Sequence, residues 1–193
     1  MESHFFAMMS RMKYIERWVL MRNSQSENIS EHSLEVGMLA HALAVISNKR
    51  LNNGLNAEKA ALIGLYHDST EIITGDMPTP VKYYNHEIQT AFKDIEKTAA
   101  RRLLEKLPED LKEAYHSLFF QAEGEEYLWK LVKAADKLSA LIKCIQEENA
   151  GNTEFASAKK SLTETLVNMR LQEVDIFMEE FLPSYYRTLD ELN

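Results

Sequence analysis

Three residues with metal-binding or acid–base side chains lie within five positions of one another: His67, Asp68 and Glu71. Imidazole and carboxylate groups bind divalent metal ions, and a carboxyl group beside such a site can transfer a proton. If the segment is helical, residues three and four apart share a face, which would hold Glu71 next to whatever His67 and Asp68 bind. The pattern is typical of a metal site with a neighbouring general acid or base.

Two further candidate ligands are His32, upstream, and Asp136, which borders a largely apolar stretch downstream. Two imidazoles and two carboxylates suit one divalent transition ion, such as Co, Mn, Zn, Fe or Ni, better than calcium. Taken singly, each residue is more often a surface or hydrogen-bonded group, and Asp136 could simply lie exposed beside Lys137. His41 is nine positions after His32, so it is expected on the opposite helix face, away from the metal.

Hydrophobic periodicity predicts an all-α fold in which His32, the His67–Asp68 pair and Asp136 lie on three different helices. The expected helices are residues 3–16, 30–47, 57–73, 86–107, 109–119, 125–149, 154–170 and 173–181. Ser30 and Asn56 are predicted N-caps, and Gly75 ends the helix that carries the pair. Two prolines exclude regular helix from residues 76–80. No linker or repeat divides the chain, so residues 1–193 are expected to form one domain.

The composition restricts the classes of function. The 193 residues carry a formal net charge of −8, which argues against a broad surface for nucleic-acid polymers or anionic membranes, although a pocket for one phosphate needs only a few cations. A single cysteine, Cys144, rules out a disulfide within the chain and fits a reducing compartment. The start of the sequence lacks a basic leader with a sustained apolar core, and no long apolar run suggests a membrane span. We therefore expect a cytoplasmic protein.

Several blocks of sequence resemble the bacterial HD-domain 5′-deoxynucleotidases, which belong to the HD superfamily of metal-dependent phosphohydrolases. The His-Asp pair alone is a weak marker, but the combined blocks are specific and the similarity runs essentially from end to end. The blocks that carry the resemblance are residues 17–23, 31–34, 66–71, 74–83, 151–152 and 181–184.

The resemblance implies an HD-domain helical bundle, usually a homodimer, that hydrolyses 2′-deoxyribonucleoside 5′-monophosphates to deoxynucleoside and phosphate. The implied ligands of one divalent metal ion are His32, His67, Asp68 and Asp136. Glu71 matches the family's catalytic acid beside the metal. The implied substrate contacts are Arg17 for the phosphate, Trp18 against the 2′ position of the sugar, and Thr74 and Asp76 for the sugar.

Two alternatives stay open at this point. The first is another HD phosphohydrolase that acts on a tri- or pyrophosphate; alarmone hydrolases place an Asp directly after the equivalent of Glu71, where this chain has Ile72. An HD phosphodiesterase for cyclic dinucleotides would need additional metal-binding histidines. The second alternative is a non-catalytic, nucleotide-binding helical module, which would have no need for Glu71.

Overall fold

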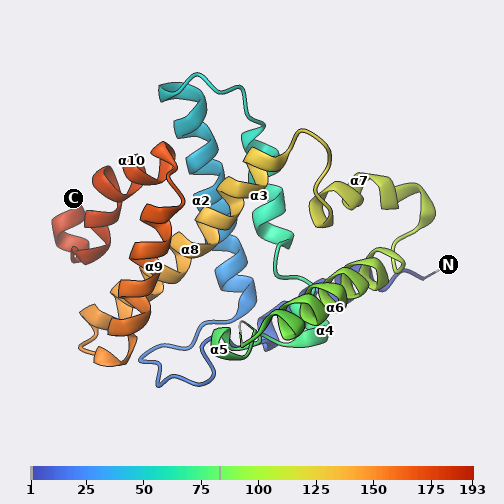
Figure 1. Cartoon of the computed structure of the whole chain (residues 1–193), viewed down its shortest axis with the longest axis horizontal. Helices are drawn as coiled ribbons and strands as arrows, with labels where there is room; N and C mark the ends of the chain where they lie inside the picture. The colour runs from blue at the N-terminus through green and yellow to red at the C-terminus, as the bar shows by residue number, and fades with distance from the viewer. Residues whose placement is uncertain (1, 83) are drawn as a thin grey trace.

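The computed structural model describes residues 2–82 and 84–193; Met1 and Tyr83, the last residue of the 74–83 block, lie outside the described residues. In these two ranges the regular structure is helical, with no strand and one isolated β-bridge between Glu16 and Asn28. The all-α class is therefore confirmed (Figure 1). The elements are α1 (Phe5–Met9), η1 (Ser10–Tyr14), α2 (Ile29–Arg50), α3 (Ala57–Tyr66), α4 (Glu71–Thr74), α5 (Thr79–Lys82), α6 (His86–Leu104), α7 (Glu109–Phe119), α8 (Glu126–Asn149), η2 (Thr153–Phe155), α9 (Ala156–Asn168), α10 (Gln172–Glu180), η3 (Leu182–Tyr186) and η4 (Leu189–Leu192).

The core lies where α2, α3 and α8 cross in the middle of the molecule (Figure 1). Its fully buried side chains recur at helical spacing, as Val36 and Leu43 do on α2 and Leu131 and Leu138 on α8. A smaller cluster joins α1 to the end of α6 around the buried ring of Phe5. No helix in the described part of the chain is both long and apolar enough to cross a bilayer.

The predicted helix at residues 57–73 is wrong in one respect, because it is interrupted directly after Tyr66. Residues 67–70 form a turn, and α4 begins at Glu71. The backbone N–H groups of Ser69 and Glu71 donate to carbonyls three residues back, at 3.1 and 2.9 Å, in place of the fourth. The Ser69 hydroxyl also donates to the Tyr66 carbonyl at 2.6 Å, which competes with continued helix. The His67–Asp68 pair is consequently in a turn between two helices.

Other helix bounds also differ from expectation: the predicted helix at residues 3–16 is α1 followed by the 3-10 helix η1, and the helices predicted at 86–107 and 154–170 end earlier, at Leu104 and Asn168. Asn28, not Ser30, caps α2: its side chain accepts from the N–H groups of Ser30 and Glu31, and the Glu31 carboxylate accepts from the Asn28 N–H in return. The short helix α5 begins at Thr79 despite Pro80, because a proline in the first helical turn loses no intrahelical hydrogen bond. The predicted end at Gly75 is confirmed, with a φ of 72° that favours glycine.

Helices α2 and α3 approach each other most closely where Gly64 faces Gly37. A Cβ atom at Gly64 would lie 2.8 Å from the Gly37 Cα and 3.0 Å from the Val36 carbonyl oxygen, both in the backbone of α2. We expect Gly64→Ala to force the helices apart and to lower the free energy of unfolding by about 1–3 kcal/mol, measured by urea denaturation. Gly54→Ala, where a Cβ atom would meet open space, is the control. Equal stability of the two variants would contradict the close packing inferred here.

Candidate metal centre and adjoining cavities

His32, on α2, is fully buried against α8, and both of its ring nitrogens have defined neighbours. Its Nδ1 atom is 3.0 Å from the Ser139 hydroxyl oxygen, and that hydroxyl donates to Glu35 at 2.5 Å. Because the Ser139 proton is directed to Glu35, the Ser139 oxygen accepts the proton of His32 Nδ1. His32 Nε2 is thereby left with its lone pair, 3.2 Å from an oxygen of Asp136 and 3.4 Å from one of Asp68.

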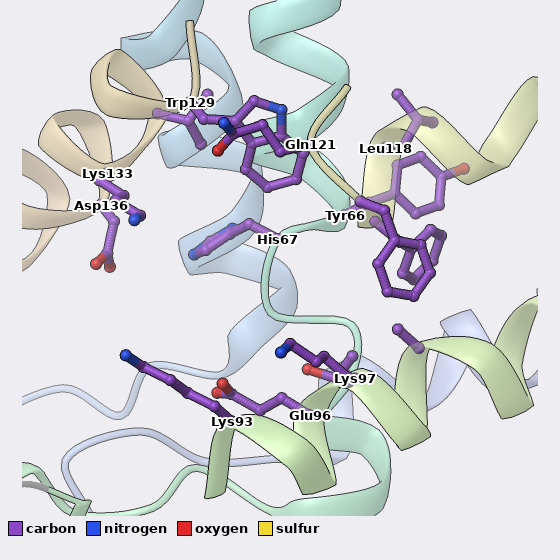
Figure 2. Close-up of a pocket in the computed structure, with 15 residues that line it drawn as sticks. Tyr66, His67, Lys93, Glu96, Lys97, Leu118, Gln121, Trp129, Lys133 and Asp136 are labelled. Atoms are coloured by element: carbon purple, nitrogen blue, oxygen red, sulfur yellow. The ribbon is translucent and has the colours of Figure 1, made fainter. Parts of the chain in front are cut away.

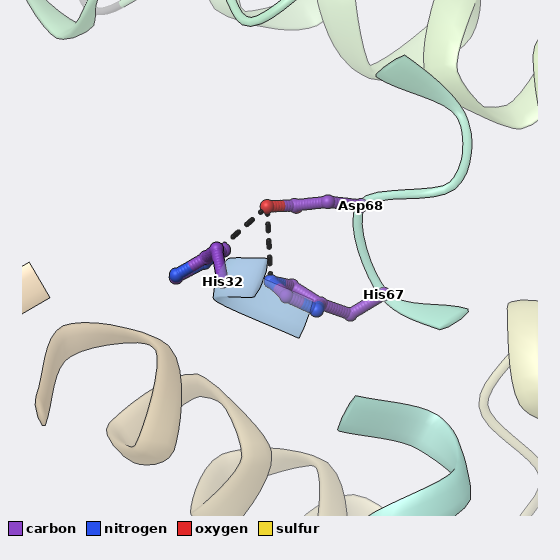
Figure 3. Close-up of side chains that lie close together, drawn as sticks. All are labelled: His32, His67 and Asp68. Atoms are coloured by element: carbon purple, nitrogen blue, oxygen red, sulfur yellow. Dashed lines mark ion pairs between the residues drawn. The ribbon is translucent and has the colours of Figure 1, made fainter. Parts of the chain in front are cut away.

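His67 has the same arrangement by a different route. Its Nδ1 atom donates to the Gly64 carbonyl at 2.7 Å, in the last turn of α3. Its buried Nε2 atom has no hydrogen-bond partner in the described structure, although it lies 3.1 Å from Asp68 Oδ2. Figure 3 shows the Asp68 carboxylate pointing to both imidazoles, whose ring centres are 5.2 Å apart.

These side chains fit a divalent metal ion. One ligand atom each from His32, His67 and Asp68 lies within 4.8 Å of the others, and Asp136 contacts His32 from α8. Each histidine uses Nδ1 to bind protein and directs Nε2 to the carboxylates, which is how metal-binding histidines are usually oriented. A buried nitrogen lone pair without a partner is costly unless a ligand binds it. His41, by contrast, is exposed on α2, as expected.

Glu71 begins α4, directly after the turn that carries His67 and Asp68. Its carboxyl group is almost fully buried, and Oε2 has no hydrogen-bond partner among the described residues. Burial raises the pKa of Glu71 to about 9, and the negative charges of Asp68 and Asp76 add to the effect. In the absence of metal this carboxyl group therefore holds a proton at neutral pH.

Arg17 lies in the loop between η1 and α2, and it supplies positive charge close to the cluster. Its guanidinium donates to Glu27 at 2.6 Å, and its side chain is 11% exposed. Burial lowers the pKa of Arg17, but surrounding carboxylates raise it above its ordinary value overall. These carboxylates belong to Glu27, Asp136, Asp68 and Asp76. Arg17 is thus one cation beside the acidic side of the centre, and Lys137 is another, with its Nζ atom 2.8 Å from Asp136 Oδ2.

Trp18 and Asp76 lie beside Arg17 in the wall of a cavity of about 410 Å³. The remaining wall comes from residues 19–21 and 77–80 and from α9. Burial raises the pKa of Asp76, although its carboxylate accepts a hydrogen bond from the Trp18 backbone N–H. The structure does not bring Thr74 to this wall: its hydroxyl donates to the neighbouring Gly75 carbonyl at 3.0 Å.

A second cavity, of about 460 Å³, reaches the cluster from the side of α6, α7 and α8. His67 points into it between Asp136 and Lys93, as Figure 2 shows. Half of its other lining residues are lysines and aromatic side chains, namely Lys97, Lys133, Tyr66, Phe119, Phe120 and Trp129. His67 and Asp136 thus line this second cavity, whereas the first cavity is lined by Arg17 and by none of the four candidate ligands.

Three residues of the centre's surroundings were missed in the sequence: Glu27, Glu35 and Ser139. Helical spacing could have indicated two of them, because Glu35 follows His32 by three positions and Ser139 follows Asp136 by three. Glu27 lies in a loop whose path cannot be derived from periodicity, so no comparable signal exists for it.

The chain matches known proteins over most of its length. Residues 4–185 match the family model described as 5′-deoxynucleotidase YfbR-like. A 5′-deoxynucleotidase of Erwinia tasmaniensis is 52% identical over 191 residues, which cover 99% of this chain and 96% of the relative. The 5′-deoxynucleotidase YfbR of Shigella dysenteriae is 49% identical over 192 residues, which cover 100% of this chain and 96% of the relative.

Solved structures resemble the fold. An HD-domain phosphohydrolase from Listeria innocua matches with a TM-score of 0.82 at 23% identity, over 94% of this chain and 88% of that one. A cyanophage S-2L HD phosphohydrolase, bound to dA and one catalytic Zn²⁺ ion, matches with a TM-score of 0.66 at 22% identity, over 94% and 96% of the two chains. These structures have the same fold as this chain, and the family model and the relatives near 50% identity show that the chain belongs to the YfbR-like 5′-deoxynucleotidase family.

Proposed function

We propose that this protein is a metal-dependent phosphomonoesterase that hydrolyses 2′-deoxyribonucleoside 5′-monophosphates to deoxynucleoside and phosphate, and that it discriminates against ribonucleotides. The observation that carries the proposal is the buried cluster of His32, His67 and Asp68, with Glu71 and Arg17 close by. The names of the relatives support the same activity. His32, His67, Asp68 and Asp136 are the proposed ligands of one divalent ion.

The proposed contacts to the nucleotide follow from the cavity beside the cluster. Arg17 offers a planar set of donors that suits phosphate oxygens. Trp18 forms the wall that leaves no room for a 2′-hydroxyl, and Asp76 accepts from the sugar. Thr74 is the contact that this geometry supports least, since its hydroxyl bonds to the adjacent backbone.

The chemistry divides between the metal and Glu71. Phosphate monoesters hydrolyse extremely slowly without catalysis, and a divalent ion held by the four ligands would supply positive charge to the phosphoryl oxygens. Arg17 neutralises and orients the phosphate beside that charge. Glu71 is the proposed proton-transfer group, since Oε2 is buried and has no competing hydrogen bond. A falling rate at high pH would identify it as proton donor, and a falling rate at low pH as acceptor.

We propose that the metal is a divalent transition ion, namely Co, Mn, Zn, Fe or Ni; the Zn²⁺ ion of the cyanophage enzyme supports zinc. We also propose that residues 1–193 form a single domain, that two copies form a homodimer, and that the enzyme is cytoplasmic. A tri- or pyrophosphate substrate and a purely binding role have less support, because the relatives near 50% identity are 5′-deoxynucleotidases.

Phosphate release from dAMP and AMP tests the proposed function directly. The purified protein is stripped with chelator and reloaded separately with Co, Mn, Zn or Mg. We expect metal-dependent release from dAMP and little from AMP, and Trp18→Ala is expected to reduce the ratio of the two kcat/KM values by roughly 10–100-fold. Equal release from both nucleotides would remove the sugar selectivity. No release with any metal would refute the proposed activity.

Ser139→Ala should weaken metal binding. It removes the hydroxyl that accepts the Nδ1 proton of His32 and links it to Glu35, so His32 is no longer fixed with Nε2 facing the carboxylates. We expect the dissociation constant for Co²⁺ or Mn²⁺, measured by calorimetry, to rise about 10–100-fold. The matched control is Ser157→Ala, which changes a serine of α9 in the wall of the cavity that contains Arg17 and Trp18. An unchanged constant would show that the link to Glu35 does not orient His32.

Glu71→Gln should lose activity and gain stability. We expect phosphate release to fall by roughly 10²-fold or more, with metal affinity retained. The raised pKa means that the stabilising contribution of Glu71 is fully present below its ordinary pKa and is lost as pH rises towards about 9. Without metal, the variant and the wild type should therefore unfold at similar temperatures near about pH 5, and the variant at the higher temperature near about pH 8.5.

The control for this prediction is Glu179→Gln, which changes an exposed glutamate of α10. It should leave both the activity and the pH dependence of thermal unfolding, measured by calorimetry with chelator present, as in the wild type. A Glu71→Gln variant that is less stable than the wild type at alkaline pH would show that the buried carboxyl group is ionised in the folded protein.

A further inference from the structure

Glu27 lies at the end of the loop between η1 and α2, and its carboxylate binds two residues of the proposed substrate site at once. Its Oε2 atom accepts a hydrogen bond from Arg17 Nη1 at 2.6 Å and another from Trp18 Nε1 at 2.9 Å. The Glu27 side chain is 13% exposed, so both bonds are largely shielded from water and salt. One oxygen atom therefore fixes the guanidinium and the indole relative to each other.

The backbone places Glu27 opposite Arg17. The Arg17 N–H donates to the Glu27 carbonyl at 2.8 Å, and the Ile29 N–H donates to the Ile15 carbonyl at 3.0 Å. Together with the bridge between Glu16 and Asn28, these bonds form a short antiparallel ladder that ends at the capped start of α2. These backbone hydrogen bonds thus fix the position of Glu27 close to the helix that carries His32.

Trp18 is held in place at both its backbone and its side chain. Its φ of 58° lies in the left-handed region, which bulky residues adopt only when the surrounding structure enforces it. The indole N–H is the only hydrogen-bond donor of the side chain, and Glu27 accepts it. The ring also packs edge-on against Phe155, with centres 5.3 Å apart. The contact with Phe155 limits the tilt of the ring, and the bond to Glu27 fixes its rotation.

Other carboxylates also attract the positive charge of Arg17. The carboxylates of Asp68, Asp76 and Asp136 all act on its guanidinium. These carboxylates belong to the proposed contacts of the metal and the sugar, and the bond to Glu27 holds the guanidinium against their attraction. The bond to Glu27 uses one N–H group of Arg17, on Nη1, and leaves the remaining N–H groups for a phosphate.

We infer that Glu27 is a positioning residue that couples phosphate binding to sugar discrimination, through the shared bond to Arg17 and Trp18. The inference rests on the proposed function, because it assigns Glu27 a part in the same substrate site. Since one oxygen serves both donors, loss of that oxygen disturbs the phosphate contact and the 2′ wall together.

Glu27→Gln tests the coupling. The amide can place either its oxygen or its NH2 group towards the two donors, so at least one of the two hydrogen bonds is lost or weakened. We expect the KM for dAMP to rise about tenfold and the dAMP/AMP ratio of kcat/KM values to fall about tenfold, with unchanged metal affinity by calorimetry. In a Trp18→Ala background, Glu27→Gln should still raise KM but should leave the ratio unchanged.

Glu16→Gln is the matched control, because it removes the same charge from an exposed side chain of the same loop. It should leave KM and the ratio as in the wild type. If Glu27→Gln does not fold, Glu27→Asp keeps the charge but shortens the side chain by one methylene, so its carboxylate no longer reaches both donors, and it should lower the ratio. A purely structural defect would reduce turnover of both nucleotides equally, and an unchanged ratio in the folded variants would overturn the inference. Wild-type protein that releases no phosphate from dAMP would instead refute the proposed function, and the inference with it.

Discussion

The imidazole of His32 has no exposed surface, so each of its ring nitrogens must find a partner inside the protein. The Ser139 oxygen accepts a hydrogen bond from Nδ1–H and its hydroxyl donates to Glu35, which leaves Nε2 with a lone pair directed at two carboxylates. This demand fixes the separation of α2 and α8 at the centre. The contact of α3 with α2 at Gly64 then brings His67 to the same point.

Helix α8 contacts both the candidate metal centre and the loop that carries the proposed substrate contacts. Asp136, Ser139, Lys143 and Glu147 follow one another at intervals of three or four residues, so they form one polar stripe along the helix. Glu147 accepts from the backbone N–H groups at 24 and 25 and from Asn152. Burial raises its pKa, but hydrogen bonds from Lys143 and the loop lower it to about 2. The same face that presents Asp136 therefore anchors the Arg17 loop about three turns away.

The parts of this site that could be predicted from sequence are those that lie on regular helices. The periodicity placed His32 and Asp136 on separate helices, and the structure brings them to 3.2 Å. The role of the Glu27 carboxylate could not be predicted from the sequence. Its position depends on a loop that is closed by backbone hydrogen bonds between residues 15–17 and 27–29, which no helical periodicity indicates. The polar stripe on α8, in contrast, could have been predicted from the sequence, because charged residues at helical spacing inside an apolar helix require buried partners.

The turn after Tyr66 changes the backbone hydrogen bonds of Ser69 and Glu71 but not the backbone angles of His67, which stay helical at φ −59° and ψ −41°. Adjacent Cβ atoms of a helix point about 100° apart. The side chains of His67 and Asp68 nevertheless meet, with His67 Nε2 3.1 Å from Asp68 Oδ2. Because α4 resumes at once, Glu71 lies at its first position, buried close to the Asp68 charge that helps to raise its pKa. The proposed ligands His67 and Asp68 therefore lie in the turn itself, and the proposed proton-transfer group lies where the helix begins again, so the helix predicted for residues 57–73 is correct for α3 and wrong at the candidate site.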